Sequence, residues 1–221
     1  MAAHRRSQAA YADRLIETLR PFIPAGAKTL LDIGGSTGVV AARMCQEFGL
    51  EAVILDPSVE CTTTTPHVKW SRGLLEDMTG AYIREVLGTK AFDVVLMCQT
   101  VDHLWNLKAG LQTMRELIAP NGICFVDIVD FRFQYLRTDV LAKVFKIDHP
   151  YYLTESRMDE VLSEIGLEWL EKVYERDGAH VGYLCRSVPP LMPAMLDATR
   201  LMLVEFRYAE AMRRAQRTRS L

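Results

Sequence analysis

A carboxylate and a group of small residues stand together near the start of the chain, and this combination can hold a ligand. Asp32 lies in the apolar stretch at residues 29–33. The turn after this stretch is rich in small residues, namely Gly34, Gly35, Ser36 and Gly38. Glycines let the backbone turn tightly and approach a ligand closely. A carboxylate just before the turn would repel a pyrophosphate there, whereas it suits a ligand that carries a cationic ammonium group.

A second carboxylate, Asp56, ends the next apolar stretch at residues 51–56. A carboxylate at this place can accept hydrogen bonds from both hydroxyls of a ribose. Asp56 therefore predicts an adenosine-containing ligand, although it does not separate S-adenosylmethionine from NAD. Together with Asp32, it favours S-adenosylmethionine, which carries an ammonium group and no phosphate.

Strands and helices that alternate along the chain must position these carboxylates. Apolar stretches predict strands at residues 29–33, 51–56, 92–98 and 123–129, and residues 68–71 are the candidate for a further strand. Helical patterns at residues 75–87 and 104–118 lie between them, so we expect a parallel sheet covered on both faces. Two later stretches, 167–176 and 179–187, are joined by Asp177-Gly178, which is typical of a hairpin. The expected fold class is α/β, with a Rossmann-like, seven-stranded, mostly parallel sheet, an antiparallel C-terminal hairpin, and N- and C-terminal helices.

One domain should include the whole chain, residues 1–221. We expect a core at 27–187, an N-terminal helix at 4–20 and a C-terminal helix at 190–217. Residues 131–153 are aromatic-rich and lack regular periodicity, so they are expected to form an irregular lid. Thr154 is expected to cap a helix that Gly166 ends.

Several motifs agree in order and spacing with one known family. Residues 31–38 resemble the first motif of class I S-adenosylmethionine-dependent methyltransferases, and residues 55–57 resemble the second. Residues 92–104 are similar to the fourth-strand motif, and residues 117–123 to the helix-turn-strand that follows. The resemblance covers about residues 27–187 and implies S-adenosylmethionine as the cofactor.

The resemblance also implies roles for matching positions. Asp32 and Gly34 would face the methionine part of the cofactor, with Gln99 near it. Asp56 would hold the ribose, and Leu74 and Leu75 would border the adenine. The remaining residues expected to bind the cofactor are Gly35, Ser36, Gly38 and Pro57. Ser36 departs from the family because a glycine usually stands there. No acidic residue directly follows Gly73 either, so backbone groups and Leu74 are expected to hold the adenine.

Methyl transfer to a hydroxyl or an acidic carbon requires a base, which must lie beyond the strand ends. His149 is our first candidate and His103 the second. Asp148 stands beside His149 and would orient it or change its acidity. Asp127 and Asp130 suggest a metal site with a histidine, but their spacing is not distinctive and we expect no metal.

The acceptor is expected to be a small molecule. Phe131, Tyr151 and Tyr152 are the candidates for contacting it, although such aromatic residues also serve as core. The fourth strand ends in Cys-Gln-Thr and lacks the Asn/Asp-Pro-Pro-aromatic run that resembling enzymes use on amino groups. The expected reaction is therefore methyl transfer to an oxygen or carbon.

Composition limits the partners. The net charge of −2 does not favour a nucleic-acid partner, and no apolar run is long enough to span a membrane. Five widely spaced cysteines indicate reduced thiols and a cytoplasmic location, without a zinc site. The terminal helices favour a lid or a homodimer. Two alternatives remain open: an NAD-dependent oxidoreductase, and a non-catalytic scaffold that binds S-adenosylmethionine or only keeps the fold.

Overall fold

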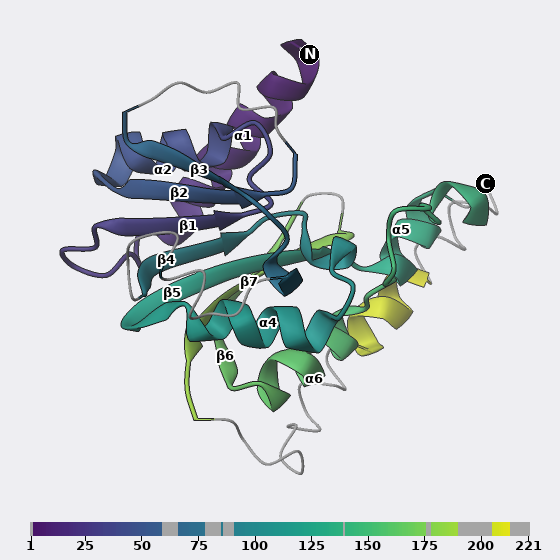
Figure 1. Ribbon diagram of the computed structural model, residues 1–221. Helices are drawn as coiled ribbons and strands as arrows, with labels where there is room; N and C mark the ends of the chain where they lie inside the picture. The colour runs from purple at the N-terminus through teal and green to yellow at the C-terminus, as the bar shows by residue number, and fades with distance from the viewer. Residues whose placement is uncertain are drawn as a thin grey trace.

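The computed structural model describes residues 2–58, 66–77, 85, 91–138, 140–175, 178–189 and 205–212 (Figure 1). Seven strands in these residues form one sheet in the order β3-β2-β1-β4-β5-β7-β6. The strands are β1 (Thr29–Ile33), β2 (Glu51–Asp56), β3 (Val68–Arg72), β4 (Phe92–Met97), β5 (Ile118–Val129), β6 (Leu167–Tyr174) and β7 (His180–Ser187). The first five strands run parallel, whereas β7 is antiparallel to both β5 and β6. The expected fold class is confirmed.

Helices cover both faces of the sheet. Among the described residues the α-helices are α1 (Ala2–Leu19), α2 (Val39–Phe48), α4 (Leu107–Glu116), α5 (Phe131–Thr138) and α6 (Glu155–Glu164). Short 3-10 helices are η1 (Leu75–Asp77), η2 (Val101–His103) and η3 (Leu141–Lys143). In Figure 1, α1 and α2 lie on one side of the sheet, and α4 and α6 on the other. Residues 205–212 are also helical.

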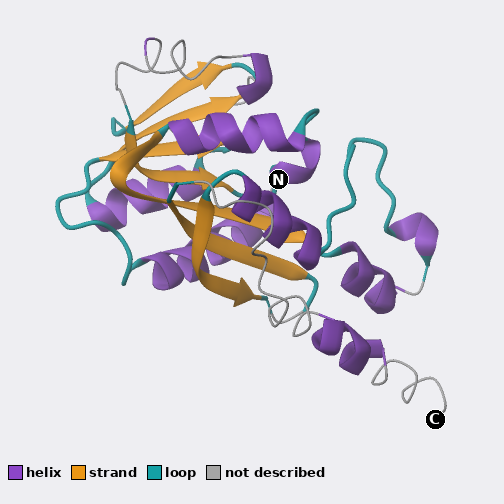
Figure 2. Cartoon of the chain, turned by 90° about the horizontal axis from the view of Figure 1, so that it is seen from below, coloured by secondary structure: helices purple, strands orange, loops and turns teal. Residues whose placement is uncertain are grey.

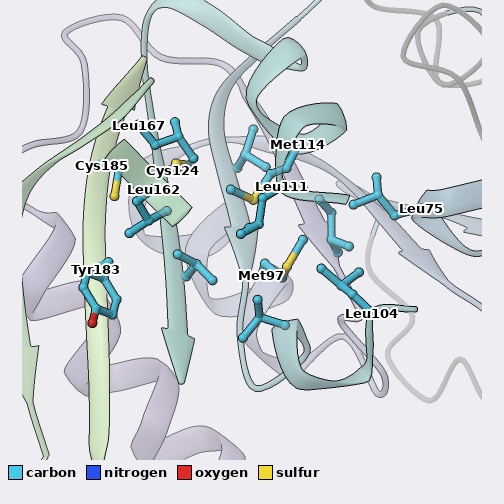
Figure 3. Packing of buried hydrophobic residues seen from close by; sticks show 14 of the residues in the cluster. Leu75, Met97, Leu104, Leu111, Met114, Cys124, Leu162, Leu167, Tyr183 and Cys185 are labelled. Atoms are coloured by element: carbon cyan, nitrogen blue, oxygen red, sulfur yellow. The ribbon is translucent and has the colours of Figure 1, made fainter. Parts of the chain in front are cut away.

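Alternation along the strands divides the core into two layers. Val95 and Met97 of β4 join the cluster under α4 and α6, shown in Figure 3. Val94 and Leu96 of the same strand join the cluster under α1 and α2. Successive strand side chains point to opposite faces. A strand that is covered on both sides therefore shows a continuous apolar run.

Local chemistry sets the helix ends that the sequence indicated. The Thr154 side chain accepts a hydrogen bond from the Arg157 backbone N–H at 3.3 Å, as an N-cap does. Gly166, after α6, has a φ of 75°. Asn106 caps α4 in the same way, by accepting from the Ala109 N–H at 3.1 Å. The cap and the glycine expected for α6 are confirmed.

Two boundaries around α4 differ from the expectation. The helix begins at Leu107 and not at residue 104, because η2 and the Asn106 cap precede it. Ile118 belongs to β5, which was expected to begin at residue 123. The register shifts from Phe92 opposite Ile118 to Val94 opposite Ile123. The turn-forming residues 120–122 occupy this irregularity, so the strand passes through them.

The lid at residues 131–153 is not wholly irregular, because residues 131–138 form α5. Only Phe133 of this helix is buried, so no apolar stripe indicated it. Asp130 starts the helix by accepting hydrogen bonds from the backbone N–H groups of Arg132 and Phe133, at 2.9 and 3.3 Å. The helix therefore depends on its cap and its neighbours.

Some expectations fall partly outside the described residues. Of the helix expected at 75–87, residues 75–77 form η1 and residue 85 is helical. Of the C-terminal helix expected at 190–217, residues 205–212 are described and helical. Asp177 of the expected hairpin turn lies outside the described part, whereas Gly178 is described, with a φ of 71°.

Candidate functional site

The site lies where the sheet changes direction of winding, at the carboxyl ends of β1 and β4. These strands are neighbours, but their chain connections run to opposite sides. A crevice opens at such a point in α/β sheets. Gly34 follows β1 with a φ of +74°, and a Cβ there would overlap the Thr100 side chain. The turn therefore requires glycine at this position.

Ser36 keeps the geometry that a glycine would have. Its φ is 46°, in the left-handed region. Its backbone N–H donates to Asp56 Oδ2 at 2.8 Å. This contact ties the glycine-rich turn to the end of β2, so the substitution of serine for the usual glycine does not displace the turn from Asp56.

Two cavities meet at the glycine-rich turn. The large cavity, about 730 Å³, lies between α1, Asp32 and the turn. The loop cavity, about 330 Å³, lies between the turn, Asp56 and η1. Both are lined by Gly34, Ser36 and Gln99, so a ligand that wraps around the turn can occupy both.

Asp32 is the most perturbed carboxyl in this crevice. Its Oδ2 is buried and has no hydrogen-bond partner among the described residues. Burial, followed by repulsion from Asp56, raises the pKa of Asp32 to about 7. A cationic ligand group in the large cavity would satisfy the orphan oxygen and lower this pKa. The carboxylate at this end of the crevice therefore fits an ammonium group, which would donate a hydrogen bond to it.

Asp56 has a different environment, although it is also buried. Its Oδ1 accepts from the backbone N–H of Ser58 at 2.7 Å, and its Oδ2 from Ser36. The carboxylate is thus held in place at the edge of the loop cavity, with capacity for a ligand hydroxyl. Pro57 and Leu74 also line this cavity, and so does Leu75, which lies mostly within the core.

The first helix closes the large cavity. Tyr11 on α1 donates its hydroxyl hydrogen to Asp127 Oδ2 at 2.8 Å, and Gln8 accepts from the Thr37 hydroxyl at 2.6 Å. Asp127 also accepts from the Gln99 backbone N–H, where Gln99 has a φ of 51°. Burial raises the pKa of Asp127 to about 6, against the opposing effect of these hydrogen bonds. Asp127 therefore connects α1 to the end of β4.

His149 forms a contact with a carboxylate that the sequence did not indicate. Its Nδ1 lies 2.8 Å from Asp102 Oδ2, whereas its Nε2 lies 4.0 Å from Asp148. Asp102 is therefore the closer partner. Burial lowers the pKa of His149, Asp102 opposes this effect, and Lys146 and His103 lower the pKa further. The neutral imidazole is thus favoured at neutral pH, with its Nδ1–H directed to Asp102 and its Nε2 lone pair available.

His103 packs beside this pair. Its ring centroid is 4.5 Å from that of His149, with the planes nearly perpendicular. Its Nδ1 donates to the backbone carbonyl of Asp148 at 3.0 Å. Asp102, His103 and His149 offer ligand atoms within 4.8 Å of one another, a donor set that a divalent cation can use. The expectation that no metal binds stays a prediction.

A smaller cavity of about 230 Å³ extends from His149 into the lid, and we call it the aromatic cavity. Phe131, Tyr151 and Tyr152 all line it. The Tyr152 hydroxyl donates to the Lys146 carbonyl at 2.7 Å, and the Tyr151 hydroxyl to the Trp105 carbonyl at 2.7 Å. Both rings are fixed by these backbone contacts.

A bridging cavity of about 210 Å³ joins the two halves of the site. It shares Gln99 with the large cavity and His149 with the aromatic cavity. His180, the first residue of β7, lines all three. No motif in the sequence indicated His180, Asp102 or Tyr11 as a site residue. The strand order was the signal that could have found His180, because it brings the start of β7 beside the end of β5.

Much of the chain is similar in sequence to known proteins. A family model described as a methyltransferase domain matches residues 1–172. A ubiquinone biosynthesis O-methyltransferase of Rickettsia canadensis is 26% identical over 149 residues, covering 63% of this chain and 62% of that protein. One from Caulobacter vibrioides is 30% identical over 118 residues, covering 52% and 45%. The chain thus matches less than two thirds of the length of these relatives.

A solved structure from Listeria monocytogenes, titled a putative S-adenosylmethionine-dependent methyltransferase, has the same fold. Its TM-score is 0.61 at 14% identity, with 81% of this chain and all of that chain covered. The CcbJ methyltransferase of Streptomyces caelestis gives a TM-score of 0.59 at 15% identity, with 80% and 90% covered.

Proposed function

Because the chain belongs to the methyltransferase domain family, we propose that it transfers the methyl group of S-adenosylmethionine to an oxygen or carbon of a small-molecule acceptor. The cofactor would occupy the large and loop cavities, and the acceptor the aromatic cavity. Bound S-adenosylmethionine would supply a methyl group on a positively charged sulfur. The protein's own residues align the two ligands and remove the acceptor's proton.

The orphan oxygen of Asp32 supports the cofactor assignment. A buried carboxylate without a partner is costly, and an ammonium group removes that cost. Asp56 accepts ribose hydroxyls, while Leu74 and Leu75 border the adenine. Gly35 also belongs to this assignment, because a Cβ there would lie 2.6 Å from Asp32 Oδ2. Gly38 precedes α2 with a φ of 76° and completes the turn.

The pairing of His149 with Asp102 carries the proposal of catalysis. Asp102 holds the Nδ1–H, so Nε2 can take the acceptor's proton as the acceptor oxygen bonds to the methyl carbon. Bound S-adenosylmethionine would supply the methyl group, with the sulfur as the leaving group, and the proton would stay on Nε2 of His149 until it passes to water. His103 would support the ring of His149 and is the second candidate base.

The acceptor chemistry follows from the walls of the aromatic cavity. Phe131, Tyr151 and Tyr152 suit a planar apolar ring, and the volume of about 230 Å³ suits a single ring. A base beside such walls favours a phenolic hydroxyl, whose proton is acidic enough for imidazole to remove in the transition state. The names of the curated relatives, O-methyltransferases, support oxygen over carbon.

The first test measures calorimetric binding of S-adenosylmethionine, S-adenosylhomocysteine and NAD to the purified protein. We expect the first two to bind and NAD not to bind. A panel of one-ring phenols is then incubated with S-adenosylmethionine, and release of S-adenosylhomocysteine is followed. Binding of NAD alone would overturn the proposal in favour of an oxidoreductase. Cofactor binding without turnover of any acceptor would favour the scaffold alternative.

A matched pair of variants separates catalysis from folding. His149→Ala should abolish turnover while cofactor affinity stays within about twofold. His67→Ala is the control, because His67 is exposed and paired with Glu51 at the other end of the sheet. Unchanged turnover in His149→Ala and His103→Ala would mean that alignment alone suffices and that the base assignment is wrong.

Location and assembly belong to the proposal as well. No helix among the described residues is both long and apolar enough to cross a membrane. The four described cysteines form no disulfide, which supports a cytoplasmic location. A homodimer through the terminal helices has less support at α1, because its apolar side chains Leu15, Ile16 and Leu19 are buried within the chain. Light scattering of the full chain tests this assembly.

A further inference from the structure

The helix α5 supplies a wall of the aromatic cavity, although it does not pack on the sheet. Phe131 and Gln134 from this helix line the cavity. Figure 1 shows α5 projecting beyond the layers of the core, and Figure 2 shows it apart from the sheet. An eight-residue helix with one buried side chain is marginal by itself. Contacts outside the sheet must therefore fix the position of this wall.

One such contact lies at the start of the helix. Asp130 is fully buried, and its Oδ2 accepts from the backbone N–H of Glu155 at 2.8 Å. Its Oδ1 accepts from the first N–H groups of α5. The Phe131 N–H donates to the Leu153 carbonyl at 2.9 Å. These bonds tie the first turn of α5 to the first turn of α6, but they leave the outer side of α5 uncovered.

Residues 205–212 cover that outer side. Arg132 donates to Glu205 at 2.9 Å, and its guanidinium lies 4.7 Å from the Tyr208 ring centroid. Phe133 packs edge-to-face against Tyr208 at 5.8 Å. Figure 2 shows this helix beside α5. The covering segment comes from more than 60 residues further along the chain.

Arg207 is the centre of this arrangement. Its guanidinium lies between two rings, 4.4 Å from the Phe133 centroid and 3.9 Å from the Tyr174 centroid. It donates to the carboxylate of Glu155 and, at 2.7 Å, to the backbone carbonyl of Gly178. One side chain thus joins the C-terminal helix to α5, α6, β6 and the turn before β7.

The charges around Arg207 are balanced within a partly buried group. The Glu155 side chain is only 1% exposed and also accepts from Lys172 at 3.1 Å and from the Tyr174 hydroxyl at 2.6 Å. Lys172 pairs in addition with Asp159 at 2.7 Å. The group holds two cations and two carboxylates. Such networks stabilise one arrangement only when every member is present.

We propose that Arg207 is a positioning residue for the acceptor site. It holds the C-terminal helix against α5 and thereby fixes the position of Phe131 and Gln134, the residues of α5 that line the aromatic cavity. This inference rests on the proposed function for its kinetic readout. It assigns the C-terminal helix to acceptor binding, whereas no residue of 205–212 lines the large or the loop cavity, which the cofactor would occupy.

The test compares Arg207→Ala, Arg207→Lys and the wild-type full chain. Hydrogen exchange at residues 131–138 should become at least about tenfold faster in Arg207→Ala, because the outer cover of α5 opens. The KM for the best phenol of the panel should rise about tenfold, as for the loss of one charge-assisted contact. Affinity for S-adenosylhomocysteine should stay within twofold. Arg207→Lys should rescue part of both effects, because an ammonium still reaches Glu155.

A second design removes the charge imbalance, in case Arg207→Ala fails to fold. The double variant Glu155→Gln with Arg207→Met leaves the group neutral but without the link. We expect a melting temperature near that of the wild type, with exchange at α5 still fast and the acceptor KM still raised. Arg186→Ala, which removes an exposed pair with Glu168, is the control and should change none of these values.

The outcomes separate this inference from the proposed function. If hydrogen exchange at α5 stays as slow as in the wild type in Arg207→Ala and in the double variant, the inference is overturned, whether or not any phenol is a substrate. Fast hydrogen exchange at α5 with an unchanged acceptor KM would also overturn it, because acceptor binding would then not depend on the contacts of Arg207. If no phenol is methylated by the wild type, the proposed function fails, and the exchange measurement still decides whether Arg207 holds α5.

Discussion

His149 has two ring nitrogens in different surroundings, and this difference is what a base requires. Nδ1 lies 2.8 Å from Asp102, whereas Nε2 lies 4.0 Å from Asp148, and His149 lines both the aromatic and the bridging cavity. A carboxylate partner fixes the tautomer and stabilises the imidazolium that forms during proton transfer. Lys146 acts in the opposite direction, because its charge lowers the pKa of His149. Asp102 and Lys146 therefore change the pKa of His149 in opposite directions.

The pH profile of kcat/KM tests this arrangement. The neutral form of His149 is the active base, and its pKa lies below the ordinary 6.5. We expect kcat/KM to fall at acidic pH, with the midpoint of this limb of the profile below pH 6.5. Lys146→Met should move this limb to higher pH, whereas Asp102→Asn should move it to lower pH and reduce kcat about a hundredfold. Shifts of the limb in the same direction would contradict the assignment.

Asp32 makes a second prediction, about stability. Its pKa is about 7 in the folded protein and ordinary in the unfolded chain, so the folded state holds an extra proton between about pH 4 and 7. This group therefore stabilises the ligand-free fold as the pH falls towards 4, and its full penalty is present above pH 7. Asp32→Asn should stabilise the ligand-free protein at pH 8 by roughly 2 kcal/mol, measured by urea unfolding.

The same variant should lose cofactor affinity, because the amide does not compensate an ammonium group. Calorimetry at pH 8 should show at least about tenfold weaker binding of S-adenosylmethionine. A variant that gained stability and kept full affinity would remove Asp32 from the cofactor site. Residues with a cost to stability and a gain in binding are common at functional sites.

The sequence indicated the residues that belong to local motifs, but not those that meet through the fold. Asp32 and Asp56 stand at the ends of strands beside recognisable turns, and the structure brings both to the crevice. Asp102 stands directly before His103, yet its contact is with His149, 47 positions along the chain. No spacing rule predicts this contact. It depends on how the lid folds back over η2.

At the scale of elements, the turn after β1 is the part with least freedom. Gly34 has a φ of +74°, and a Cβ there meets Thr100. Gly26 has nearly the same φ, +77°, but no atom lies within 4 Å of a Cβ built there. The two glycines therefore separate backbone strain from steric overlap. Only Gly34 lines the large and loop cavities, so only an overlap at Gly34 would also disturb the site.

Alanine substitution at these two positions makes the third prediction. Gly26→Ala should cost about 1 kcal/mol, the strain of a left-handed alanine. Gly34→Ala should cost more, about 3 kcal/mol, because Thr100 must also move. Thermal unfolding measures both, and cofactor affinity should fall only in Gly34→Ala. Equal losses at both sites would mean that the turn yields easily.

The elements that the sequence predicted are those whose apolar pattern faces the sheet. Four of the five parallel strands contain continuous apolar runs, whereas β3 (Val68–Arg72) has only Val68 buried. The helix α6 has a cap and an apolar stripe. The helix α5 has no apolar stripe and projects beyond the layers of the core. Asp130 and residues 205–212 hold it in place. The sequence did not predict that β5 begins at Ile118, for a different reason. Pro120 to Gly122 are turn-forming residues, and a register shift accommodates them within the strand.

At the scale of the whole molecule, segments from the two ends of the chain complete the two halves of the site. The helix α1 covers the large cavity through Tyr11 and Gln8. Residues 205–212 hold the outer wall of the aromatic cavity. Between them, His180 of β7 lines both the large and the aromatic cavity, and Gln99, just after β4, joins the large cavity to the bridging cavity. Binding in either half should therefore stabilise the fold beyond the sheet.

The final prediction concerns that coupling. Saturation with S-adenosylhomocysteine at about 100 times its Kd should stabilise the protein by about 2.7 kcal/mol. For a chain of this size, this free energy raises the melting temperature by roughly 5–10 °C. NAD at the same concentration should leave the melting temperature unchanged. Asp56→Ala should remove most of the shift, because the ribose hydroxyls lose their acceptor, whereas Asp148→Ala, an exposed residue beside His149, should retain it. A shift that persists in Asp56→Ala would place the adenosine elsewhere, and the loop cavity would then need another ligand.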